Sequence, residues 1–94
     1  MRLEKNEIEI VKKSIEAIFG KSKIYLFGSR LDNSKKGGDI DLFIVPENRD
    51  TLYEKKIKAI AKLERYLYKP IDIVVHKDFK REIEEEGLSG VLLK

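Results

Sequence analysis

The chain has 94 residues, which is the size of one small domain and leaves no room for a second domain that closes over an active site. Its 20 Lys and Arg residues against 17 Asp and Glu residues give a net charge of only +3, so the sequence predicts no dedicated nucleic-acid-binding surface. Cysteine is absent and no apolar stretch is long enough to cross a membrane, so we expect one cytoplasmic domain over residues 1–94, held together by packing.

The first predicted element is an amphipathic helix. Asn6 with Glu9 resembles an N-terminal capping arrangement, and Gly20 is a typical C-terminal stop. The helix is indicated by apolar residues that recur at helical spacing, namely Ile8, Val11, Ile15 and Ile18.

Two strands with a polar loop between them are predicted next. The apolar run 24–27 is typical of a buried strand and ends at Gly28 and Ser29. Residues 31–38 are polar and glycine-rich, which predicts a loop. A second strand covers residues 39–45 and is closed by Pro46, because proline cannot continue the hydrogen-bond ladder.

A second helix, a third strand and a short last helix complete the chain. Thr51 with Glu54 predicts a capping box for the second helix. Pro70 precedes a strand over residues 71–75, the last helix is expected over 78–86 with Gly87 as its end, and residues 90–94 form either an edge strand or coil. The buried stripe of the second helix is predicted to be Tyr53, Ile57, Ile60, Ala61, Leu63 and Leu67.

This order of elements predicts an α/β (α+β) fold with a single small mixed sheet flanked by helices.

Three aspartates stand where a buried strand favours apolar residues. Asp39 and Asp41 are two apart on a strand, so their side chains project from the same face. Asp72 repeats the pattern between two isoleucines on the next strand. Because like charges repel unless a cation lies between them, and oxygen ligands favour Mg²⁺ or Mn²⁺, the three acids indicate a metal site. Taken singly, the pair is also explained as a solvated strand end, and Asp72 as a cap of the preceding turn.

Gly28, Ser29 and Arg30 lie where the first strand ends. Glycine lets a phosphate approach the backbone closely, the serine hydroxyl donates to it, and the arginine adds positive charge. When it is considered alone, Gly-Ser is better explained as an ordinary turn. The loop that follows is long enough for this turn to face the acids.

Together these segments resemble the nucleotidyltransferases of the DNA polymerase β superfamily. Leu26-Phe27-Gly28-Ser29, Asp39-Ile40-Asp41-Leu42 and Ile71-Asp72-Ile73-Val74 are similar to the three parts of that signature, and the short length resembles its minimal nucleotidyltransferases. The resemblance implies a nucleotidyltransferase-like fold, ATP or another NTP bound by Gly28, Ser29 and Arg30, and two metal ions, Mg²⁺ or else Mn²⁺, held by the catalytic Asp39, Asp41 and Asp72.

The resemblance also implies a partner. Minimal nucleotidyltransferases commonly pair with a HEPN-domain toxin as its antitoxin, so we expect a hetero-oligomer in which AMP, or another NMP, is moved onto a tyrosine of that toxin. The competing hypothesis is an antitoxin without catalysis that binds nucleotide and neutralises its partner by contact alone. A response-regulator receiver leaves the Gly-Ser turn unexplained, and a glycosyltransferase needs a longer chain.

Overall fold

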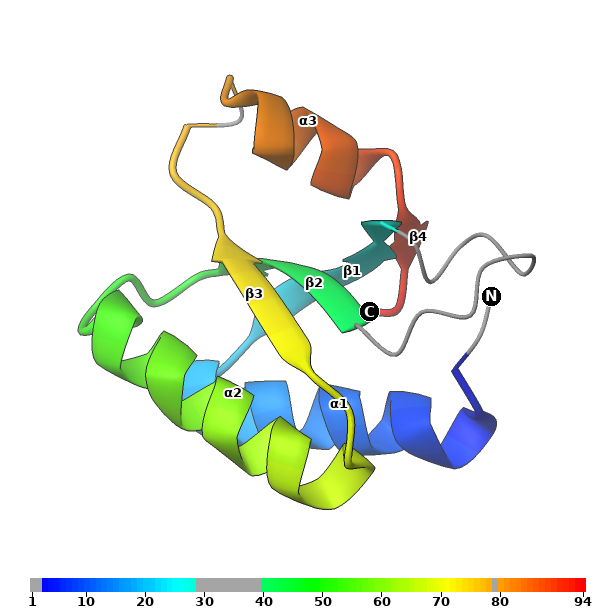
Figure 1. Ribbon diagram of the computed structural model, residues 1–94. Helices are drawn as coiled ribbons and strands as arrows, with labels where there is room; N and C mark the ends of the chain where they lie inside the picture. Colours follow the sequence, from blue (N-terminus) through cyan, green and yellow to red (C-terminus); the bar gives the residue numbers. More distant parts are fainter. Residues whose placement is uncertain (1–2, 29–39, 79) are drawn as a thin grey trace.

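The computed structural model describes residues 3–28, 40–78 and 80–94. These residues form three helices, α1 (Lys5–Phe19), α2 (Leu52–Leu67) and α3 (Glu82–Leu88). They also form four strands, β1 (Ser22–Phe27), β2 (Ile40–Pro46), β3 (Ile71–Val75) and β4 (Val91–Leu92). The predicted α+β fold with one mixed sheet is therefore confirmed, and the tail 90–94 contributes an edge strand (Figure 1).

The strands are arranged in the order β3-β2-β1-β4. β1 pairs antiparallel with β2 and with β4, whereas β2 pairs parallel with β3. A parallel pair needs a crossover connection, and α2 provides it between β2 and β3. The register of the two central pairs places Phe27 opposite Asp41 and Asp41 opposite Asp72.

The main core lies between the sheet and the layer formed by α1 and α2, which both lie below the sheet in Figure 1. Alternate residues of β2 point into this core, because successive side chains of a strand project from opposite faces. The fully buried residues Ile40, Leu42 and Ile44 of β2 meet Val11, Ile15, Ala59 and Leu63 from the helices. Asp41, Phe43 and Val45 consequently lie on the other face of the sheet.

Helix α3 packs on that other face, above the sheet in Figure 1. Gly87 lies against the buried ring of Phe43, where an added Cβ would be only 2.7 Å from the Phe43 Cβ. Gly90 lies as closely against the backbone of Leu26. Helix and tail thus approach the sheet at two points where a side chain does not fit.

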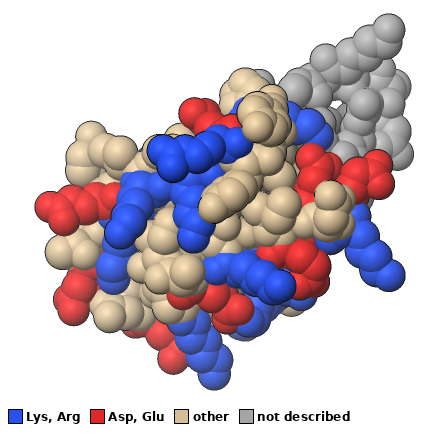
Figure 2. Space-filling view, turned by 90° about the horizontal axis from the view of Figure 1, so that it is seen from below, with Lys and Arg blue, Asp and Glu red and all other residues tan. Residues whose placement is uncertain are grey.

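The layer of α1 and α2 carries both signs of charge on its outer surface. Figure 2 views the molecule from below, onto this layer, and shows Lys and Arg interspersed with Asp and Glu. Ion pairs connect neighbouring elements here: Lys69 Nζ lies 2.9 Å from Glu7 Oε2. A nucleic-acid footprint would show a stripe of positive charge, and the described side chains of this face form a mixed pattern instead.

The ends of α1 and α2 differ in part from the sequence prediction. α1 begins after Glu4, whose backbone N–H donates to the Glu7 carboxylate at 2.9 Å, so the capping pair Asn6–Glu9 was predicted wrongly by two residues. Gly20 ends α1 with φ +78°, as predicted. Thr51 does precede α2, but its φ of 49° turns it into the left-handed region and its side chain makes no capping hydrogen bond.

The buried side of α2 also differs from the prediction. Ala59, Leu63 and Leu67 are buried and Ile60 packs against the core, so the predictions for Ile60, Leu63 and Leu67 are confirmed. Tyr53 is 75% exposed, Ile57 is 50% exposed and Ala61 is also exposed, so these three were predicted wrongly. Leu52 rather than Tyr53, and Ala59 rather than Ile57, belong to the side of α2 that packs on the core. Two large apolar side chains are left at the surface.

Helix α3 is shorter than predicted. Residue 78 does not begin it: the Asp78 carboxylate accepts hydrogen bonds from the N–H groups of Lys80 (2.9 Å) and Arg81 (3.2 Å) and so caps a turn that precedes the helix. Gly87 lies inside α3 rather than at its end, since its role is close packing on Phe43. Similarly, Pro46 is the last residue of β2, paired with Ser22, and not the residue after the strand.

Candidate active site

Two of the predicted site residues, Asp41 and Asp72, lie side by side on neighbouring strands. Each is the second residue of its strand, and they are direct partners in the parallel register of β2 and β3. Adjacent strands are about 4.8 Å apart, so the two carboxylates project together from the face opposite α1 and α2. Asp41 is half-buried and Asp72 is exposed. The two acids form an acidic spot on the face of the sheet that also carries α3.

Gly28 brings the end of β1 against Asp41. Phe27 is the register partner of Asp41, and Gly28 follows with φ +80°, a conformation that favours glycine. A Cβ built on Gly28 would collide with Asp41 Oδ2 and lie 3.1 Å from the carboxyl carbon. The bare glycine backbone therefore touches one carboxylate of the pair, and only a residue without a side chain permits this contact.

The remaining predicted site residues, Ser29, Arg30 and Asp39, and the predicted loop over residues 31–38, lie outside the described residues. Within ranges 3–28, 40–78 and 80–94 there is no group of three or more Asp, Glu, His or Cys side chains placed to hold a metal ion. The carboxylates of Asp41 and Asp72 supply oxygen atoms on one face of the sheet. Oxygen atoms are the ligands that Mg²⁺ and Mn²⁺ take from proteins. The chemistry of this pair therefore fits the predicted metal.

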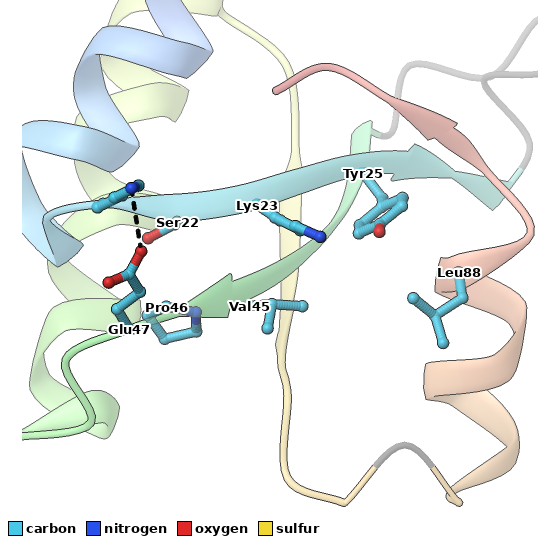
Figure 3. A pocket seen from close by; sticks show the side chains of 8 residues that line it. Ser22, Lys23, Tyr25, Val45, Pro46, Glu47 and Leu88 are labelled. Atoms are coloured by element: carbon cyan, nitrogen blue, oxygen red, sulfur yellow. Dashed lines mark ion pairs between the residues drawn. The ribbon is translucent and has the colours of Figure 1, made fainter.

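A pocket of about 480 Å³ lies on the same sheet face but at the other end of the strands (Figure 3). Lys23, Tyr25 and Val45 line it together with Leu88 of α3, and the ion pair Lys21–Glu47 at 3.6 Å lies at its rim. Along β2 the residues of this face run Asp41, Phe43, Val45. Phe43, whose ring centroid is 5.8 Å from that of Tyr25, therefore separates the pocket from the carboxylates.

The sequence prediction missed a charged cluster between β3 and α3. Glu84 is fully buried, and its carboxylate accepts hydrogen bonds from the Lys77 N–H (3.0 Å) and from Arg81 Nε (2.5 Å). Its other oxygen lies 2.8 Å from His76 Nδ1. Arg81 also donates to the Val75 carbonyl at 2.9 Å. Through Arg81, His76 and Lys77 the buried Glu84 therefore connects the end of β3 to α3, and we call this connection the β3–α3 corner. The sequence could not indicate this, because Glu84 stands among the acidic residues of Glu82–Glu86 and its burial follows from the contact of Gly87 with Phe43.

Comparison with known protein families identifies the family of the chain. The family described as "Nucleotidyltransferase domain" matches residues 8–92, a range that includes Gly28, Asp41, Asp72 and α3. The chain belongs to this family, and its general activity is nucleotidyl transfer from a nucleoside triphosphate. No curated protein is similar enough to count as a match. In the described part of the chain, every helix is too short or too polar to cross a bilayer.

Proposed function

We propose that this chain is a Mg²⁺-dependent enzyme that moves AMP, or another NMP, from an NTP onto a hydroxyl group, namely a tyrosine of a HEPN-type toxin that it thereby neutralises. The observation that carries the proposal is the parallel register of Asp41 and Asp72, with the backbone of Gly28 against the first of them. The two paired acids can bind a cation, and the glycine backbone beside them leaves room for the triphosphate that the cation accompanies.

Each residue has a role in this proposal. Gly28, Ser29 and Arg30 hold the triphosphate, and Asp39, Asp41 and Asp72 hold the metal. Bound Mg²⁺ would supply neutralisation of the phosphate charge and polarisation of the phosphoryl oxygens. The acceptor oxygen forms a bond to the α-phosphorus, the bond from that phosphorus to the bridging oxygen breaks, and pyrophosphate leaves. The exposed Asp72 carboxylate takes the hydroxyl proton.

The open position of the carboxylates favours a macromolecular acceptor. Asp72 is exposed at the sheet surface, and positioning of two reactants can account for about 7–11 kcal/mol of a barrier. A small domain offers little surface to position a free acceptor, so in the proposal the partner supplies that positioning within a hetero-oligomer. A cytoplasmic setting with abundant NTP is part of the same proposal.

The competing function is inhibition by contact, with a nucleotide site that does not turn over. The half-buried Asp41 and the exposed Asp72 are compatible with both functions, so the experiment has to separate modification from binding. Identification of the adjacent reading frame would give the partner to be used.

The test is intact-mass spectrometry of the co-purified pair incubated with Mg²⁺ and ATP. We expect the mass of one AMP on the partner, no transfer to free tyrosine, and no added mass with Asp41→Asn or Asp72→Asn. Asp50→Asn is the matched control, because Asp50 is exposed at the other end of β2. If the partner stays unmodified and the acid variants still inhibit it, contact alone is the function.

A further inference from the structure

A second pocket lies at the free edge of β3, between the beginnings of α2 and α3. We call it the edge groove. Its volume is about 480 Å³, similar to that of the pocket in Figure 3, but it lies at the sheet edge, on the side where α2 and α3 both begin in Figure 1. Its apolar lining is formed by Leu52, Tyr53, Val74, Val75 and Ile83.

The apolar wall of the edge groove continues onto the surface of α2. Tyr53 is 75% exposed and Ile57, one helical turn further on, is 50% exposed. Residues four apart lie on the same side of a helix, so these two form one apolar strip beside the groove. Ile83 of α3 is also exposed at the opposite wall. Large apolar side chains gathered in this way mark surfaces that bind a partner.

The rim of the edge groove is positively charged. Arg49, Lys56 and Lys77 line it, and none of the described residues that line it is acidic. Arg49 donates to the His76 carbonyl at 2.5 Å, whereas Lys56 and Lys77 take part in no ion pair among the described residues. Arg81 also lines the groove, but the buried Glu84 offsets its charge at 2.5 Å. The groove thus presents unpaired cations around an apolar floor.

The complementary surface is present on the same chain. Glu82, Glu85 and Glu86 are exposed on α3, and helical spacing places them on one side of it. In the described part of the chain none of the three takes part in an ion pair. This acidic side begins next to Ile83, which lines the edge groove. Basic groove and acidic helix are therefore neighbours on one surface.

We propose that two copies of this chain associate through this surface, with the acidic side of α3 of each copy against the edge groove of the other. A two-fold axis requires a self-complementary patch, and a groove beside a helix of opposite charge and shared apolar residues meets this requirement. Lys56 and Lys77 of one copy face Glu85 and Glu86 of the second, and Tyr53 covers Ile83.

The association is independent of the proposed function and compatible with it. The edge groove is at the C-terminal end of β3, where Val74 and Val75 line it, whereas Asp72 is near the beginning of the strand. The carboxylate pair of each copy therefore stays open in the dimer. Whether the chain transfers a nucleotide does not affect the association.

Sedimentation velocity over a series of protein concentrations tests the proposal. We expect a reversible dimer at low salt that dissociates in about 1 M NaCl, because the Debye length falls to about 3 Å there. Lys56→Glu/Lys77→Glu, and separately Glu85→Lys/Glu86→Lys, should raise the dissociation constant by about tenfold or more. Tyr53→Ser should weaken the dimer at low salt without any change of charge. The control Lys13→Glu/Lys58→Glu makes the same charge change at two exposed lysines outside the groove and should not weaken it.

Mixing the two charge-reversed variants gives the decisive result. In a homodimer of either variant, like charges face each other at both contacts. In the mixed dimer, opposite charges face each other at both contacts. Native mass spectrometry of the mixture should therefore show a heterodimer and little of either homodimer. Absence of the heterodimer, with both variants folded by circular dichroism, would overturn the proposal. So would a wild-type chain that is monomeric at low salt at every concentration. A monomeric chain whose groove amides shift in NMR spectra with polyglutamate would then point to a partner of another sequence.

Discussion

Replacing Gly28 by alanine should impair nucleotide binding as well as the stability of the fold. The new Cβ meets two obstacles: φ at this position is +80°, and the atom collides with Asp41 Oδ2 and lies 3.1 Å from the carboxyl carbon, where ordinary contacts begin at 3.4 Å. The left-handed backbone costs an alanine about 1–2 kcal/mol. The carboxylate can rotate away from the methyl group, so we expect a total loss of about 1–3 kcal/mol in the free energy of unfolding. That rotation, however, displaces Asp41 from its place beside Asp72.

Urea unfolding and titration calorimetry with Mg²⁺ and ATP separate the two effects. Gly20→Ala is the matched control, because Gly20 has φ +78° and nothing within 4 Å of its added Cβ. Gly20→Ala should lower the free energy of unfolding through backbone strain and keep the wild-type affinity for ATP. We expect Gly28→Ala to lower that affinity by about tenfold, or about 1.4 kcal/mol. Equal affinity in the wild type and in Gly28→Ala would refute the idea that the glycine positions Asp41 for the nucleotide.

Four further results are expected. Titration calorimetry should show ATP binding that is lost in EDTA, since triphosphate and carboxylates repel each other without a cation; equal affinity would contradict the metal site. Asp72→Asn should leave the melting temperature in EDTA unchanged or slightly raised, because it removes one of two facing charges, and a clear fall would indicate a structural role instead. Glu84→Gln should cost about 2–4 kcal/mol in urea unfolding, because the charged partner of Arg81 is lost inside the protein; a cost near zero would mean that the corner is held by other contacts. Gly87→Ala should destabilise by about 1–3 kcal/mol despite the better helix propensity of alanine, and Phe43→Leu in the same chain should recover part of the loss; a stabilised single variant would disprove the close packing.

The strands could be predicted well because each is a short apolar run with a clear end. Residues 71–75 form β3 as predicted, and β2 follows the predicted run up to its proline. The placement of Asp41 and Asp72 on strands is confirmed for the same reason: an acid inside an apolar run is conspicuous. Their roles, and those of Gly28, Ser29, Arg30 and Asp39, stay predictions, because they depend on a ligand and on residues beyond the described ranges.

The helices were harder because their boundaries depend on partners far away in the chain. A glycine after an acidic run is typical of a helix end, but Gly87 is required by Phe43, more than forty residues earlier in the chain, and the helix continues through it. Tyr53, Ile57 and Ala61 were wrongly predicted as buried because apolar residues occur on more than one side of α2. The small Ala59 is fully buried there and belongs to the core cluster. The apolar character of a side chain therefore does not by itself show whether it faces the core.

The pairing of Asp41 with Asp72 in a parallel ladder has a consequence for how the chain tolerates changes in length. The distance between the two carboxylates is set by backbone hydrogen bonds between the strands, and the crossover through α2 has no part in setting it. Residues added to the turn over 47–50 should lengthen a surface connection and leave the acids in place. Removal of one residue between Pro70 and Asp72 would instead shift β3 by one position and turn that acid into the apolar core.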